Sequence, residues 1–93
     1  MKSAYELAME RLEKQSPSTN LSESQKERIA EIESIAKAKI AEKELFLREQ
    51  ITKAQFAGEL EAVVQLEQQL ARETRRIQED ADLKKEAVRS SQP

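Results

Sequence analysis

The chain has 93 residues, of which 38% are apolar and 37% are charged, with one glycine, two prolines and three aromatic residues. We expect one structural unit, because domains commonly run to about 100 to 150 residues. Its net charge is -2, with 10 basic and 10 acidic residues before Gly58 and 6 basic and 8 acidic residues from there on. Neither half therefore carries the positive excess that phosphate binding needs.

The composition is typical of long helices and coiled coils. Ala, Glu, Lys, Leu, Gln and Arg are abundant, and these residue types lose little side-chain freedom in a helix. An elongated helical protein exposes much surface per residue, so its stability must come from one seam and from association with partners. We therefore predict an all-α fold, and we expect self-association.

The first residues are charged and lack the apolar stretch of an export signal. No apolar run approaches the roughly 20 residues needed to cross a bilayer. The absence of cysteine is compatible with the cytosol but does not identify it. We expect a cytoplasmic protein that does not associate with membranes.

A short amphipathic helix is predicted from about residue 4 to residue 14. Ser3 and Glu6 have the spacing of a capping box. About three helical turns are too few for stability in water, so the apolar face must dock on the rest of the chain or on another molecule. In its spacing, this face resembles the anchors of a helix laid into an apolar groove. The residues of the face are Tyr5, Ala8, Met9 and Leu12.

Residues 15–21 are predicted to form a linker, because Pro17 stands among small polar residues that compete with helical hydrogen bonds. Asn20 or Ser22 would cap the next helix, which has neither Gly nor Pro as far as Ala57. At 1.5 Å per residue this helix would be about 50 Å long. Its apolar stripe consists of Ile29, Ile32, Ala36, Ile40, Leu47, Ile51 and Ala54, with Lys43 in the gap before Leu47.

Gly58 is the only glycine and lies where the apolar stripe pauses. A left-handed glycine there would end one helix, and Glu59 would suit the start of the next. The alternative is a glycine tolerated inside one continuous helix, at a cost of about 1 kcal/mol relative to Ala. We favour the turn. After it, the stripe resumes with Leu60, Val63, Leu66, Leu70, Thr74, Ile77, Ala81 and Val88.

A reversal at Gly58 predicts an antiparallel two-helix coiled-coil hairpin over residues 22–88, preceded by the short helix within residues 1–14. Residues 89–93 have no apolar anchor and are expected to fray. The predicted register opposes Ile51 to Val63, Leu47 to Leu66 or Glu67, Ile40 to Thr74, Ala36 to Ile77, and Ile32 to Ala81.

Several large apolar residues lie outside this seam. On a helical wheel, Ile35 and Phe46 lie at its shoulder, whereas Ala38, Leu45 and Phe56 lie nearly opposite it. They are either ordinary surface residues or a second contact surface. The first helix or a second hairpin, completing a four-helix bundle, would bury Ile35 and Phe46. The candidate partner-binding residues are Tyr5, Met9, Leu12, Ile35, Leu45, Phe46 and Phe56.

The sequence offers no catalytic, cofactor or metal site and no small-molecule substrate. It has no histidine, and its single glycine cannot build a phosphate-binding loop. The acidic residues that come closest to a cation site would point to different sides of a helix, with no loop oxygens beside them. We interpret them as a solvated charged face. They are Glu79, Asp80, Asp82 and Glu86.

A small basic group supports an alternative role as a nucleic-acid-associated accessory protein. Antiparallel pairing would bring Lys37 and Lys39 near Arg75 and Arg76, with Arg72 beside them. Acidic residues intervene, and no aromatic residues are interleaved for base stacking. The leading hypothesis is therefore a non-enzymatic interaction or scaffold protein. Its partner would be itself, as a homodimer or four-helix bundle, or another helical protein.

The opening KSAYELAMERL segment, the Ser/Pro linker, and the segments Gln25-Lys26, Ala30–Ile32 and Lys39–Glu42 before a glycine turn resemble a group of small uncharacterised bacterial proteins. The resemblance covers nearly the whole chain and implies a helical hairpin. Gly58-Glu59 stands where a Gly-Asp pair would be expected. The resemblance implies no activity.

Overall fold

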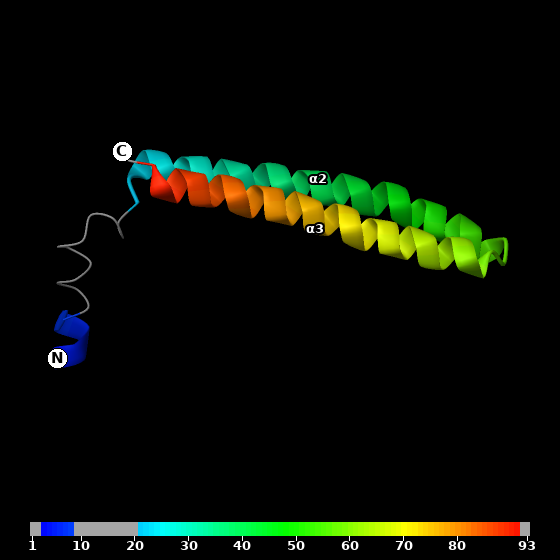
Figure 1. The fold of residues 1–93 in the computed structure, drawn as a ribbon, viewed down its shortest axis with the longest axis horizontal. Coiled ribbons are helices and arrows are strands. Elements are labelled where there is room, and N and C mark those ends of the chain that lie inside the picture. Colours follow the sequence, from blue (N-terminus) through cyan, green and yellow to red (C-terminus); the bar gives the residue numbers. More distant parts are fainter. Residues whose placement is uncertain (1–2, 9–20, 92–93) are drawn as a thin grey trace.

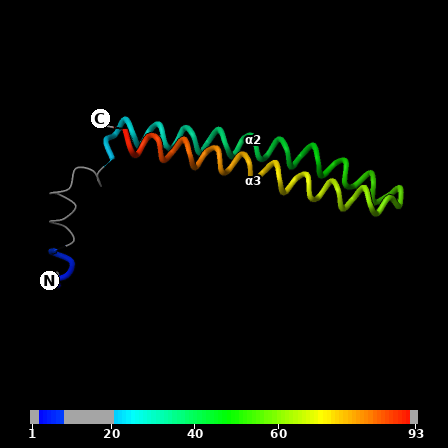
Figure 2. The backbone as a smooth tube through the Cα atoms, viewed as in Figure 1, coloured from blue at the N-terminus to red at the C-terminus, as the bar shows by residue number. Residues whose placement is uncertain are grey.

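The computed structural model describes residues 3–8 and 21–91 (Figure 1). Residues 4–8 are helical, and two long helices follow, α2 over Glu23–Phe56 and α3 over Leu60–Ser90. The two long helices run side by side in opposite directions, with the turn at one end of the pair (Figure 2). The structure thus confirms an all-α antiparallel helical hairpin preceded by a short helix.

Serine side chains cap the short first helix and α2, whereas α3 begins after Glu59 without a side-chain cap. The Ser3 Oγ accepts a hydrogen bond of 3.2 Å from the Glu6 backbone N–H. At the start of α2, the Ser22 Oγ accepts from the Gln25 N–H at 3.1 Å, and the Ser22 N–H donates to the Gln25 Oε1 at 2.9 Å. This reciprocal pair is the capping box that the sequence predicted for Ser22. The rest of the predicted first helix and most of the linker lie outside the described residues.

Gly58 reverses the chain through two hydrogen bonds that close the end of α2. The Gly58 N–H donates to the Gln55 carbonyl at 3.1 Å, and the Glu59 N–H donates to the Ala54 carbonyl at 2.9 Å. These bonds form a Schellman motif, which requires a left-handed residue between its two donors. Gly58 supplies that conformation with a φ of 73°. The prediction of a turn is confirmed, and the alternative of one continuous helix through Gly58 is wrong.

The seam of the hairpin follows the predicted stripes closely. Its buried apolar side chains are Ile29, Ala36, Leu47, Ile51, Ala54, Ala81 and Val88. Half-buried residues complete it, namely Ile32, Ile40, Val63, Leu66, Leu70, Thr74 and Ile77. Because only two helices meet, solvent reaches the seam from both sides, and Leu47 is the residue most completely enclosed.

One seam position was predicted wrongly. Leu60 stays 75% exposed. It is the first residue of α3, and Phe56 at the facing end of α2 is itself 90% exposed and does not cover it. Lys43 does face α3 in the gap before Leu47, where it contacts Glu73, but it remains exposed, and the neighbouring Glu44 is half-buried.

Two ion pairs join α2 to α3. The Lys43 Nζ lies 4.0 Å from the Glu73 Oε1, and the Lys85 Nζ lies 3.3 Å from the Glu33 Oε1. The predicted register set Lys43 opposite Ala71 and Lys85 opposite Ile29, so these long side chains reach partners two and four residues beyond the predicted positions.

Gln25 closes the open end of the hairpin. Its side chain is buried, with 5% of the residue exposed. The Nε2 donates to the Val88 carbonyl at 2.9 Å and to the Ser91 carbonyl at 2.8 Å, while the Oε1 accepts from Ser22. One amide therefore joins the first turn of α2 to the last turn of α3.

The Gln25 bonds reach into the predicted frayed tail over residues 89–93, of which the structure describes residues 89–91. Arg89 and Ser90 belong to α3, and Ser91 caps it, with its backbone N–H on the Ala87 and Val88 carbonyls. The last carbonyls of a helix need partners, and here Gln25 supplies two donor hydrogens. A polar side chain replaces the apolar anchor that the tail lacks.

Substitution of Gly58 distinguishes a turn from a continuous helix by the sign of its effect. Gly58→Ala should lower the free energy of unfolding by about 1–2 kcal/mol, since an L-residue is strained in the left-handed conformation. No atom lies within 4 Å of an added Cβ, so backbone strain is the whole effect. Urea unfolding would measure it, with Gly58→Asn losing less. Stabilisation by Gly58→Ala would contradict the turn.

Removal of the Gln25 amide should destabilise the protein more than is usual for a residue in the first turn of a helix. We expect Gln25→Ala to lower the free energy of unfolding by about 1–3 kcal/mol, because the hydrogen bonds of both amide atoms, Oε1 and Nε2, are lost. Gln68→Ala, at an exposed position of α3, should stay within about 0.5 kcal/mol of the parent. Equal effects of the two substitutions would show that Gln25 does not join the helices.

Candidate protein-interaction surface

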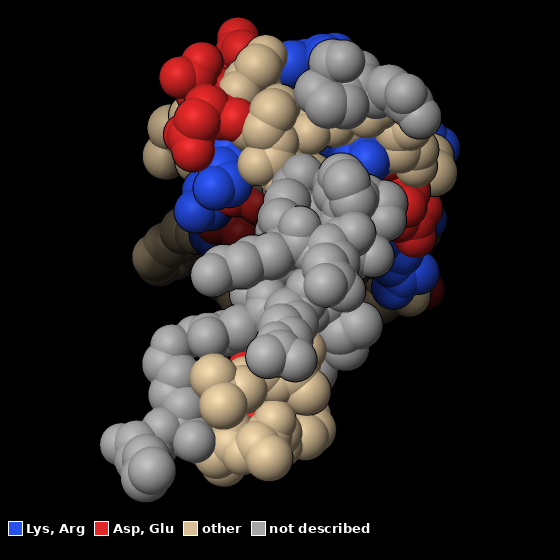
Figure 3. Space-filling view, turned by 90° about the vertical axis from the view of Figure 1, so that its left-hand side faces the viewer, with Lys and Arg blue, Asp and Glu red and all other residues tan. Residues whose placement is uncertain are grey.

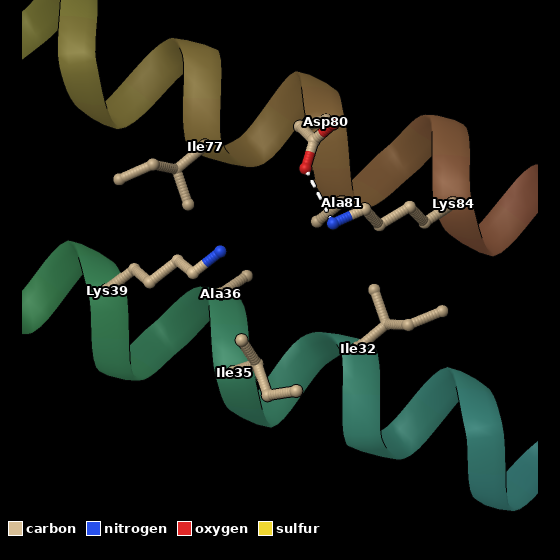
Figure 4. A pocket seen from close by; sticks show the side chains of 8 residues that line it. All are labelled: Ile32, Ile35, Ala36, Lys39, Ile77, Asp80, Ala81 and Lys84. Atoms are coloured by element: carbon tan, nitrogen blue, oxygen red, sulfur yellow. Dashed lines mark ion pairs between the residues drawn. The ribbon is translucent and has the colours of Figure 1, made fainter.

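An open apolar groove runs between α2 and α3 on one side of the hairpin (Figure 4). Ala36 and Ala81 form its floor, and their small side chains leave a shallow hollow of about 60 Å³. Isoleucines form the walls, and charged residues stand at the rim, where the Lys84 Nζ lies 3.0 Å from an Asp80 carboxylate oxygen. The remaining lining residues are Ile32, Ile35, Lys39 and Ile77.

Two of the predicted partner-binding residues belong to the groove side of α2. Ile35 lines the groove and is 49% exposed, and Phe46 is 60% exposed. They are eleven residues apart, which is close to three full turns, so both project on the same side about 16 Å apart along the helix. Lys39 and Glu42 lie between them, and both are exposed. We refer to Ile35, Lys39, Glu42 and Phe46 as the α2 flank.

The other predicted α2 residues lie elsewhere. Leu45 is 77% exposed and Phe56 is 90% exposed, and both project away from the seam. The four residues of the predicted α2 surface therefore divide between two sides of the helix. Tyr5 in the first helix is 74% exposed, and Ala8 is also exposed. Met9 and Leu12 lie outside the described residues.

Some exposed apolar residues were not singled out from the sequence. Leu60 was assigned to the seam, and Leu7, Val64 and Leu83 received no role, yet Leu83 is 72% exposed. Leu83 projects outward between seam residues Ala81 and Val88, so its place on the helical wheel was the available signal. None of these residues lines the groove of the α2 flank.

The opposite side of the hairpin is more polar. Its hollow is lined by Glu33, Ala36, Lys37, Gln78, Ala81 and Lys85. The Lys85 Nζ pairs with Glu33 at 3.3 Å and with Asp82 at 3.5 Å, and the lysine side chain is only 14% exposed. Lys85 is thus paired within the hairpin, whereas Lys37 on the same side forms no ion pair among the described residues. The two sides therefore differ, and the α2 flank marks the apolar one.

The structure does not assemble the predicted basic patch. Lys39 lines the groove of the α2 flank, whereas Lys37 lines the opposite one. The arginines Arg72, Arg75 and Arg76 are exposed on α3. Viewed from the end where α2 begins, basic and acidic side chains lie next to each other on the described surface (Figure 3). Lys37 and Lys39 therefore lie on different sides of the hairpin.

Within residues 3–8 and 21–91, no group of three acidic side chains converges as a metal site would require. No helix in these ranges has the length and apolar character to cross a membrane. Comparison of the chain with protein-family models, curated proteins and solved structures gave no significant match. The resemblance to small bacterial hairpin proteins remains a prediction.

Two adjacent residues test the division between seam and flank. Leu47→Ala should lower the free energy of unfolding by about 2–5 kcal/mol, because it empties the most enclosed position of the seam. Phe46→Ala should cost less than about 1 kcal/mol, since most of this larger side chain is already in water. Chemical unfolding of dilute protein would compare the two. A larger loss of stability for Phe46→Ala would contradict the assignment of Leu47 to the seam and Phe46 to the flank.

Proposed function

We propose that the chain is a non-enzymatic protein-interaction module that binds a helical partner through the α2 flank. The observation that carries this proposal is the open groove beside Ile35, with the exposed ring of Phe46 three turns further along the same side. Isolated exposed apolar residues are common, but two large ones on the same side of one helix, one of them lining a hollow, support a contact surface.

A helix fits this surface better than a compact domain does. The groove lies between two antiparallel helices, and a helix that packs there would cover the half-buried seam residues Ile32 and Ile77 together with the flank. Four-helix bundles bury such seams in this way, with helices about 20° from antiparallel. The hairpin then supplies half of a bundle, and its partner supplies the rest.

The proposal places the protein in the cytoplasm, where it would act as a scaffold or adaptor. No reaction is assigned, because the groove walls are aliphatic, and the rim carboxylate of Asp80 is engaged by Lys84. A general acid or base needs a group free to exchange protons with a bound substrate.

Site-specific photocrosslinking in living cells tests the proposal. A benzoylphenylalanine at position 46 should give discrete protein adducts, because the side chain at this position is covered by the partner. The matched control is the same substitution at Leu83, which is 72% exposed but lies away from the groove. Adducts should be strong at position 46 and weak at position 83.

The masses of the adducts distinguish the partners. A product of twice the 10.6 kDa chain mass indicates a second copy, and any other discrete mass indicates another protein. Absence of adducts at position 46, or the same pattern at both positions, would overturn the proposed function.

A further inference from the structure

The α2 flank has a self-complementary order. Along the helix it reads Ile35, Lys39, Glu42 and Phe46, with steps of four, three and four residues. The spacing is therefore the same in both directions, and each half of the flank contains one apolar and one charged residue. The two charged residues have opposite signs and occupy the central positions.

A second α2 packed antiparallel against this flank would match it at every position. Ile35 of one chain would face Phe46 of the other, and Lys39 would face Glu42, with each pair formed twice about a two-fold axis. Within the described ranges, Lys39 and Glu42 form no ion pair in the single hairpin. A parallel arrangement would instead oppose Lys39 to Lys39, which repels.

The adjacent side of α3 also carries one acidic and one basic residue, beside the middle of the α2 flank. Glu73 and Arg76 lie seven and four residues before Asp80, so they share the side of α3 that borders the groove. The contact between Lys43 and Glu73 sets them level with the centre of the α2 flank. When two hairpins meet antiparallel, Glu73 of one faces Arg76 of the other.

We propose that the partner is a second copy of this chain, packed antiparallel through the α2 flank to form a four-helix bundle with the two turns at opposite ends. This inference rests on the proposed function, since it identifies the occupant of the same groove. Such a two-fold interface is the commonest form of protein self-association. The apolar pairs would supply affinity, and the charged pairs would set orientation.

Charge reversal at the centre of the flank tests the orientation directly. In a homodimer, Lys39→Glu opposes two carboxylates twice, and Glu42→Lys opposes two ammonium groups twice. Each variant alone should dissociate about tenfold or more readily than the parent in sedimentation velocity at low salt. An equimolar mixture should recover the parent affinity to within about threefold, since both cross pairs are attractive in the mixed dimer.

A matched reversal on the opposite side controls for charge alone. Lys37→Glu changes an exposed lysine of the polar groove and should leave the dissociation constant of the dimer unchanged. Phe46→Glu should weaken the dimer more than either charge reversal does, and mixing it with another variant should not restore the affinity.

Two results would overturn the self-pairing. The first is a parent chain that sediments as a 10.6 kDa monomer at every concentration, and the second is a dimer whose two charge variants are not restored by mixing. If the monomer still forms adducts at position 46 in cells, the proposed function stands with a different partner. If the adducts are also absent, both proposals fail.

Discussion

The hairpin depends on the antiparallel pairing of α2 and α3. Hydrogen bonds at its two ends hold the helices together. At one end, the left-handed Gly58 closes a Schellman motif that ends α2 at Phe56 and directs Glu59 back toward the seam. At the other end, the buried amide of Gln25 bonds the last carbonyls of α3. Between them the aliphatic stripes face each other, and every statement about the surface follows from this pairing.

A pair of helices cannot enclose its own apolar residues. Each seam residue has neighbours on two sides at most, so Ile32 and Ile77 remain half-buried, and the α2 flank keeps Ile35 and Phe46 in water. On the polar side, Lys85 pairs with Glu33 and Asp82. On the other side, the walls of the hollow are isoleucines. The proposed association through the α2 flank rests on this difference in apolar character.

Helical periodicity was sufficient to predict the two long helices, the reversal at Gly58 and nearly all of the seam. It also placed Ile35 and Phe46 at the shoulder, because angles about a helix follow from residue number alone. It could not specify the ion pairs between the helices, since long side chains such as Lys43 and Lys85 reach partners that are not directly opposite. The role of Gln25 was missed because its partners are carbonyls 63 and 66 residues away, and backbone groups carry no sequence signal. The groove could not be predicted, because it forms where two small residues, Ala36 and Ala81, meet, and only the structure shows that they do.

The distance between the two ends of the hairpin tests its architecture most directly. The chain has no cysteine, so Glu27→Cys and Ala87→Cys would accept spin labels at those positions alone, and dilution with unlabelled chain would isolate the intramolecular distance. Packed helix axes lie about 10 Å apart, so the account predicts labels within about 30 Å of each other by pulsed electron resonance. A continuous helix through Gly58 would separate them by about 90 Å, and a distance of that order would contradict it.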